Sequence, residues 1–242
     1  MGEAGLKGSR RRGLGETLSG LAVAIGCVLF LGGFAWGAVL YQPYTVPTDS
    51  MSPTVEAGDR VLAERTDGHG VHRGDVVVFQ DQVWGAVPMV KRVVGVGGDT
   101  VSCCSRQGKL SVNGHPVDEP YLKRKGPDSQ TPFKPTKVPA GRLFLLGDHR
   151  LDSADSRSHL QDSSHGAVPR SAVRARVEAV AWPMSGFGML SRPGGFASMP
   201  GGISSSGPLA MQLTAVVAGA VLIFGGAAYG PIARRAGRGA RS

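Results

Sequence analysis

Two long stretches without a charged residue stand near the two ends of the chain. Residues 18–40 and residues 209–229 consist mostly of apolar and small side chains. At about 1.5 Å per residue, a helix of either length crosses a hydrocarbon core about 30 Å thick. The pattern therefore predicts a transmembrane helix over residues 18–40 and another over residues 209–229.

Each of these spans has an alternative interpretation. The first could be a cleavable signal peptide, because a basic arm precedes it and Ala35, Trp36 and Gly37 resemble a small-residue cleavage site. Its apolar run is longer than a usual signal-peptide core, which favours an anchor that is kept. The second could be a buried amphipathic helix, but it lacks the polar stripe that such a helix shows.

The section between the spans has the pattern of β-structure. Short β-branched and apolar runs recur there, separated by turn residues, and they cover residues 76–79, 90–96, 110–112, 143–146 and 173–182. Asn113 and Gly114 between apolar positions predict a hairpin turn. We therefore predict a mainly β domain over residues 41–184. The Gly-, Ser- and Pro-rich residues 185–208 predict a flexible linker.

Charge adds a topology to this picture. The formal net charge is +9, and much of it lies in an N-terminal arm, residues 1–17, and a tail, residues 230–242. The positive-inside rule then places both termini in the cytoplasm and the middle section outside, at the cell membrane. No nucleic-acid-binding motif accompanies the charge, so we expect no nucleic-acid partner.

Three cysteines are too few for a disulfide scaffold. Cys27 lies in the first apolar run and is expected to be a packing residue. Cys103 and Cys104 are adjacent, and they could form a vicinal disulfide or remain unpaired.

Ser50 and Lys91 are the candidate catalytic pair. A serine hydroxyl is a weak nucleophile at neutral pH and needs a base. Lys91 has apolar neighbours in Met89, Val90, Val93 and Val94, and the adjacent Arg92 should point to the opposite face of a strand. The ammonium of Lys91 could therefore be desolvated and lose its proton. Taken alone, Ser50 would be a turn residue and Lys91 a surface lysine. Together they predict a membrane-tethered serine/lysine hydrolase.

Four segments carry a resemblance to a known family. They read PTDSMSPTV at 47–55, RGDVVVF at 73–79, VKRVVGVGGD at 90–99 and GDHRLDSADSR at 147–157. In this order and spacing they resemble the conserved boxes of bacterial type I signal peptidases of the S26 family, in the actinobacterial-like form with a C-terminal span. The resemblance implies an antiparallel β domain with N-terminal and C-terminal transmembrane helices. It also implies an endopeptidase that removes signal peptides from exported pre-proteins after small residues, Ala-X-Ala.

The resemblance also implies roles for individual residues. Ser50 is the nucleophile and Lys91 the general base, while the backbone N–H of Ser50 and the hydroxyl of Thr48 form the oxyanion hole. Ser153 orients the lysine. The residues that support the site are Asp148, Arg150, Asp155 and Arg157. The residues that line the substrate cleft are Tyr44, Val46, Pro47, Met51 and Val90.

The histidines are expected to be outside the chemistry. His149 stands where the family usually has asparagine, which could change the hydrogen bonds of that loop without making a triad. His69 and His72 lie near Asp67, but this turn-like segment lacks four clear metal ligands, so a solvated loop is favoured. We expect no metal and no organic cofactor.

The location of Ser50 suits a membrane substrate. Ser50 lies about ten residues beyond the first span, so at about 3.6 Å per residue it is within about 36 Å of the membrane surface. The partners implied are secretory pre-protein signal peptides and the lipid bilayer, with the secretion translocon nearby.

Two other functions compete with this hypothesis. A self-cleaving serine/lysine protease of the repressor type would need a DNA-binding module and a cleavable linker, where this chain has membrane spans. An inactive membrane-anchored binding or scaffold protein is the other alternative, and intact Ser50 and Lys91 argue against it.

Overall fold

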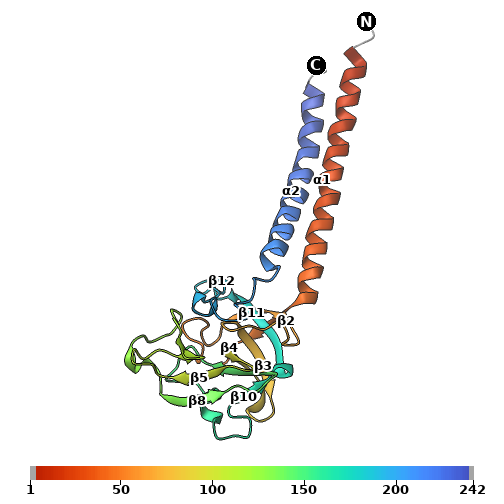
Figure 1. Ribbon diagram of the computed structural model, residues 1–242. Helices are drawn as coiled ribbons and strands as arrows, with labels where there is room; N and C mark the ends of the chain where they lie inside the picture. The colour runs from red at the N-terminus through yellow and green to blue at the C-terminus, as the bar shows by residue number, and fades with distance from the viewer. Residues whose placement is uncertain (1–3, 240–242) are drawn as a thin grey trace. The chain divides into compact units, whose positions relative to one another are not determined.

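The two ends of the chain form long antiparallel helices that pack side by side (Figure 1). In the computed structural model, which describes residues 4–239, helix α1 spans Ala4–Leu40 and helix α2 spans Leu209–Gly239. Each contains a segment long and apolar enough to cross a membrane, Thr17–Leu40 and Leu209–Pro231. Both predicted spans are therefore helical. Of the predicted arm and tail, residues 1–3 and 240–242 lie outside the described residues, and the rest continues the two helices.

Small residues let the two helices approach closely. A Cβ atom at Gly26 would lie 2.8 Å from the carbonyl oxygen of Gly219, and one at Gly219 would lie 2.6 Å from the backbone nitrogen of Phe30. The hydroxyl of Ser19 also donates a hydrogen bond of 2.7 Å to the carbonyl oxygen of Gly226. Close backbone contacts and hydrogen bonds of this kind hold helices together in lipid, where no hydrophobic drive exists between them.

The β domain, Tyr41–Ser206, contains two antiparallel sheets. The larger has the strand order β1-β2-β11-β3-β4-β9-β10, with β12 paired to β11. Its strands are β1 Tyr41–Thr45, β2 Arg60–Arg65, β3 Val76–Asp81, β4 Gly85–Val96, β9 Arg142–Leu146, β10 Ala167–Pro169, β11 Val173–Trp182 and β12 Gly188–Met189. Four short 3-10 helices connect the strands, η1 Pro127–Ser129, η2 Ser156–His159, η3 Arg170–Ala172 and η4 Gly194–Phe196.

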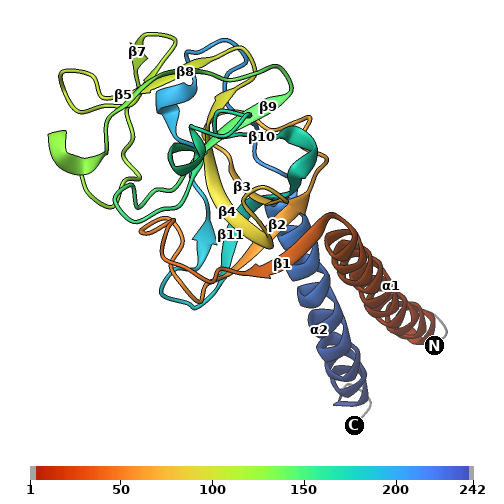
Figure 2. The same cartoon turned by 90° about the horizontal axis from the view of Figure 1, so that it is seen from below.

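The smaller sheet has the order β7-β6-β5-β8. Its strands are β5 Thr100–Cys103, β6 Ser111–Val112, β7 His115–Pro116 and β8 Phe133–Lys137. Figure 2 shows β5, β7 and β8 gathered on the side of the domain away from β1. The mainly β, antiparallel fold class with two apolar helices is thus confirmed.

The predicted strands match the observed ones closely. The runs 76–79, 143–146 and 173–182 lie in β3, β9 and β11, the run 90–96 forms the second half of β4, and the run 110–112 contains β6. Asn113 and Gly114 form the turn between β6 and β7 with φ angles of 54° and 81°. Positive φ at both central residues is the requirement of a tight type I′ hairpin, which explains why this dipeptide was a reliable signal.

The continuous apolar run in β3 reflects burial on both faces of the larger sheet. Val76 and Val78 belong to one core cluster, and Val77 and Phe79 belong to another. Successive side chains of a strand point to opposite faces, so a strand covered on both sides carries apolar residues at every position.

The segment predicted as a flexible linker is mostly part of the β domain, and that prediction is wrong. It contains β12 and η4, and the compact unit extends to Ser206. Arg192 forms ion pairs with Asp75 at 3.2 Å and with Glu178 at 2.6 Å, and Phe196 is fully buried. Composition alone predicted flexibility because it does not record these long-range partners.

The close helix contact yields a test with a matched control. Gly219→Val should destabilise the helix pair, since the added carbons meet the backbone of α1, and overpacking typically costs about 1–3 kcal/mol. Gly225→Val is the control, because nothing lies within 4 Å of a Cβ at that position. Thermal unfolding of the full chain in detergent should show a lower midpoint for the first variant only. Equal midpoints for the two variants would contradict the packing.

Candidate active site

The structure brings Ser50 and Lys91 into direct contact. Ser50 lies in the turn that follows β1, and Lys91 lies on β4. The Nζ atom of Lys91 is 2.7 Å from the Oγ atom of Ser50, which is hydrogen-bond distance. Both residues are nearly dry, with 4% of Lys91 and 7% of Ser50 exposed. A nucleophile and a base at this distance are the minimum set for nucleophilic catalysis.

Backbone hydrogen bonds and one buried side chain hold the turn that carries Ser50. The N–H of Val46 donates to the carbonyl oxygen of Asp59 at 2.9 Å, and the N–H of His149 donates to that of Ser50 at 3.0 Å. Met51 is completely buried in the core beneath the turn. Ser50 is therefore held from both sides, by the start of β2 and by the loop after β9.

Burial sets the electrostatics of Lys91. Removal from water lowers the pKa of Lys91 from its ordinary value of 10.5, while the carboxylates of Asp155 and Asp148 oppose this by raising it. The net direction is downward, because desolvation is the larger effect. A lowered pKa makes the neutral amine more accessible, and the neutral amine is the form that accepts a proton.

Thr48 lies beside Ser50. Its hydroxyl donates to the Oγ atom of Ser50 at 3.2 Å, and both residues line the same cavity. This hydroxyl is therefore close to the place where a substrate carbonyl would meet Ser50. Its role as an oxyanion donor stays a prediction.

Ser153 lies near the dyad without the predicted hydrogen bond. Its Oγ atom is buried and has no hydrogen-bond partner among the described residues. Besides Ser50, Lys91 donates to the carbonyl oxygen of Val90 at 3.2 Å. The Oγ atom of Ser153 instead faces Gly147, where an added Cβ would collide with it. The role of Ser153 in orienting the lysine stays a prediction.

The predicted ion pair of the last box is present. The Nη2 atom of Arg157 lies 2.7 Å from a carboxylate oxygen of Asp155. Asp155 also accepts a hydrogen bond of 3.0 Å from the backbone N–H of Gly147. The pair thereby connects the end of β9 to the 3-10 helix η2.

Asp148 and Arg150 pair with residues that the sequence did not suggest. Arg92, 2% exposed, lies 2.6 Å from Asp148, and its guanidinium stacks over the ring of Tyr121 at 3.9 Å. Burial acts to lower the pKa of Arg92, but attraction to the Asp148 carboxylate outweighs it and raises the pKa. Arg150 pairs with Glu119 at 2.5 Å. Only the charge of Arg92 inside an apolar run could have signalled this network from the sequence.

A cavity of about 400 Å³ opens in front of the dyad, and a larger hollow of about 840 Å³ adjoins it. The residues of the smaller cavity are Val46, Pro47, Thr48, Asp49, Ser50, Val87, Pro88, Met89, Val90, Lys91, Asp152 and Ala154. Tyr44 and Pro88 line the larger one. Of the predicted cleft residues, Met51 is the exception, because it is fully buried in the core and lines neither cavity.

His149 does not form a triad with Ser50. Its Nδ1 atom lies 3.3 Å from a carboxylate oxygen of Asp49 without hydrogen-bond geometry. Ligand atoms of Asp49, His149 and Asp152 lie within 4.8 Å of one another at the rim of the cavity. That no metal is needed stays a prediction.

The other open questions on histidine and cysteine have structural answers. His69 and His72 take part in local turn contacts, with the His69 N–H donating to Asp67 at 3.0 Å. Cys103 and Cys104 form a vicinal disulfide, and Cys27 is free. The vicinal-disulfide alternative is therefore the one that the structure supports.

Comparison with known proteins places the chain among signal peptidases. The family model described as signal peptidase, peptidase S26, matches residues 17–182 of the 242. The chain is 33% identical over 204 residues to a probable signal peptidase I of Mycobacterium leprae, covering 61% of this chain and 70% of that protein. It is 35% identical over 162 residues to signal peptidase I S of Bacillus subtilis, covering 63% and 83%.

A solved structure is also similar, a signal peptidase I from Enterococcus faecalis. It is 27% identical in sequence, and the match covers 43% of this chain and 94% of that one. The TM-score of 0.36 is too low to support an argument from its geometry.

The lowered pKa of Lys91 predicts a pH profile. Activity against a peptide should rise with pH as Lys91 loses its proton, because only the neutral amine can act as a base. The midpoint of this rise should lie below 10.5, in the direction set by burial. Measuring kcat/KM across pH for the full chain checks this. A rise centred at or above 10.5 would contradict a desolvated lysine base.

Proposed function

The chain belongs to the signal peptidase family, peptidase S26, and we propose that it cleaves signal peptides from exported proteins with Ser50 as nucleophile and Lys91 as general base. The single observation that carries this assignment is the 2.7 Å contact between Nζ and Oγ in a nearly dry site. Membership in the family provides the reaction class, and the contact provides the residues.

The geometry supports a two-step mechanism. Neutral Nζ of Lys91 takes the proton of the Ser50 hydroxyl as Oγ attacks the scissile carbonyl carbon. The resulting ammonium gives this proton to the leaving amine, and the signal peptide remains as an acyl-enzyme on Ser50. A water molecule then loses a proton to Nζ as it attacks the ester, and the proton returns to Oγ as the signal peptide leaves.

Charge that develops on the carbonyl oxygen needs donors. The backbone N–H of Ser50 is one, and the hydroxyl of Thr48 is the second, given its position 3.2 Å from Oγ. Donors that are fixed before the reaction stabilise the transition state without reorganisation cost.

Free strand edges support an extended binding mode for the substrate. Within the described residues, β1 pairs on one side with β2, and β9 pairs with β4 only from Arg92 to Val96. Residues 87–90 of β4 line the cavity at Ser50, and Tyr44 of β1 lines the larger hollow, which shares Pro88 with that cavity. An extended peptide could therefore add to these edges.

The apolar lining of the cavity supports recognition of small apolar residues. Val46, Pro47 and Val90 contribute apolar surface to about 400 Å³ of space at Ser50 and Lys91. An Ala-X-Ala motif offers two apolar methyl groups to such a surface, and no polar group of either alanine side chain would have to be buried there.

The helix pair supports a location in the membrane with both termini on one side. α1 and α2 are antiparallel, so the basic stretches Arg10–Arg12 and Arg234–Arg238 lie at the same end of the pair (Figure 1). The positive-inside rule then puts both ends in the cytoplasm and the β domain outside. Signal peptides emerge on that side, near the bilayer and the translocon.

A direct test uses a purified full-length chain and a precursor with Ala-X-Ala before its mature sequence. Wild type should release the signal peptide after the second alanine, as mapped by mass, and Ser50→Ala and Lys91→Ala should not. Cleavage by Ser50→Ala would refute the nucleophile. Folded wild-type protein that never cleaves the precursor would favour the scaffold alternative, and cleavage of its own chain would favour the self-cleaving one.

The oxyanion assignment has its own test. Thr48→Val keeps the branched shape but loses the hydroxyl, so kcat should fall by about tenfold to a thousandfold. Thr48→Ser retains a hydroxyl and should keep most of the activity. If the valine variant turns over as fast as wild type, the second donor lies elsewhere.

A further inference from the structure

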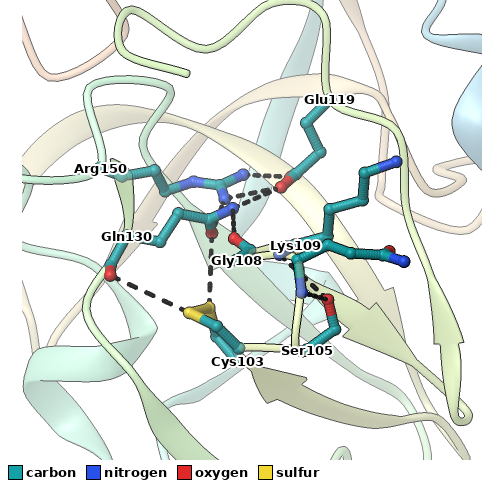
Figure 3. The surroundings of a disulfide bond; sticks show 9 residues. Cys103, Ser105, Gly108, Lys109, Glu119, Gln130 and Arg150 are labelled. Atoms are coloured by element: carbon teal, nitrogen blue, oxygen red, sulfur yellow. Dashed lines mark hydrogen bonds and ion pairs between the residues drawn. A yellow bond between two sulfur atoms is a disulfide. The ribbon is translucent and has the colours of Figure 1, made fainter. Parts of the chain in front are cut away.

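The vicinal disulfide lies against one buried side chain, Gln130 (Figure 3). The Sγ atom of Cys103 is 3.9 Å from Oε1 of Gln130, and the Sγ atom of Cys104 is 3.9 Å from the backbone oxygen of Gln130. Gln130 is only 6% exposed, as is Cys103. A change in the volume or the hydrogen bonding of the sulfur pair therefore reaches Gln130 directly.

Gln130 is in turn part of a buried hydrogen-bonded group with Glu119 and Arg150 (Figure 3). Its Oε1 atom accepts a hydrogen bond from Arg150, and its Nε2 atom donates to Glu119 at 2.9 Å. Arg150 also donates to both carboxylate oxygens of Glu119, at 3.0 Å and 2.5 Å. The side chains of Arg150 and Glu119 are 1% and 3% exposed. A buried charged group is costly unless each of its hydrogen bonds is made, so a shift of Gln130 would change the position of Arg150.

Arg150 connects this group to the nucleophile. Its Nε atom donates to the carbonyl oxygen of Gly147 at 2.9 Å. Gly147 lies so close to Ser50 that an added Cβ would be 2.5 Å from the carbonyl oxygen of Ser50. The N–H of His149, in the same loop, donates to that same oxygen.

We propose that Gln130 is a positioning residue for Ser50, acting through Arg150 and the loop 147–157, and that the Cys103–Cys104 disulfide holds Gln130 in place. The proposal rests on the assignment of Ser50 and Lys91 as the catalytic pair. It concerns residues of the smaller sheet and its loops, which touch neither reacting atom.

Reduction of the disulfide should therefore weaken catalysis. Two electrons and two protons pass from a dithiol such as dithiothreitol to the sulfur pair, giving two thiols and the cyclic disulfide of the reagent. Two thiols need more room than a bonded pair, and Cys103 and Gln130, which lie against each other, are each only 6% exposed. The Cys103 thiol also becomes a donor that competes with Arg150 for Oε1 of Gln130.

The first test compares Gln130→Met with Gln107→Met in the full chain. Gln107 lines a cavity of about 420 Å³ together with Gln130, but its side chain is exposed, which makes it a matched control. Gln130→Met should lower kcat by about tenfold to a hundredfold through displacement of the loop. Gln107→Met should behave as wild type.

The pH profile distinguishes a displaced loop from a smaller fraction of folded protein. A smaller folded fraction lowers kcat/KM at every pH but does not move the midpoint of its rise with pH. Asp148 and Asp155 face Lys91 from the loop 147–157, paired with Arg92 and Arg157, and Asp152 and Ala154 help to enclose it. Loosening this loop admits water to Lys91. The acid limb of kcat/KM should then move to higher pH in Gln130→Met, by about half a unit or more.

The second test uses reduction, which needs no variant that folds poorly. Treatment of wild type with dithiothreitol, with two new thiols verified by mass after alkylation, should lower kcat and move the acid limb in the same direction. Gln130→Met should respond little to reduction, because two changes that act through one contact are not additive.

The outcomes separate the two levels of the proposal. If wild type cleaves the precursor, Ser50→Ala does not, and Gln130→Met matches wild type in rate and profile, the positioning role is wrong. If full reduction leaves the activity of wild type unchanged, the disulfide does not hold Gln130 in place. The same conclusion follows if reduction lowers the activity of Gln130→Met by as much as it lowers that of wild type. Cleavage by Ser50→Ala would instead mean that the catalytic assignment itself has failed.

Discussion

The candidate active site depends on one lysine side chain being kept out of water beside a serine hydroxyl. In water an amine with a pKa of 10.5 is almost fully protonated at neutral pH and cannot accept a proton. In this chain burial lowers the pKa of Lys91, whose Nζ atom lies 2.7 Å from the Oγ atom of Ser50. The sheet that carries Lys91 and the loop that covers it therefore have two effects. They exclude water from the amine, and they set the distance between Nζ and the Oγ atom of Ser50.

Buried arginines hold the parts of the chain that enclose this site. Arg92 reaches Asp148 and the carbonyl oxygen of Gly74, and Arg150 reaches Glu119 and the carbonyl oxygen of Gly147. Burying a charge is costly, and such pairs add little to stability compared with apolar replacements. Their advantage here is geometric, since a guanidinium can hold a carboxylate and a backbone carbonyl at once. This arrangement ties loops of the two sheets to the turn that bears Ser50.

Local patterns predicted the elements because local physics determines them. The apolar runs of β3, β9 and β11, the hairpin at Asn113 and the two apolar helices depend on nearby residues, and the structure contains all of them. Residues 185–208 were misjudged because Gly, Ser and Pro indicate freedom only where nothing holds them. There Arg192 binds Asp75 and Glu178, which lie far away in sequence. Met51 lies in the core instead of the cleft for a similar reason, because its side chain packs in a cluster with residues such as Val61 and Val177 that lie elsewhere in the sequence.

The sequence by itself determined the antiparallel β architecture with two apolar helices and the family, and it singled out Ser50 and Lys91 as the candidate catalytic pair, since these follow from periodicity and from the order of short motifs. Only the tertiary structure decided which groups meet. It pairs Asp148 with Arg92 and Arg150 with Glu119, leaves Ser153 without its expected lysine contact, and joins Cys103 to Cys104 against Gln130. Such pairings depend on how strands and loops far apart in the chain fold over one another. Desolvation, which determines whether Lys91 can act as a base, exists only once that folding has removed the water.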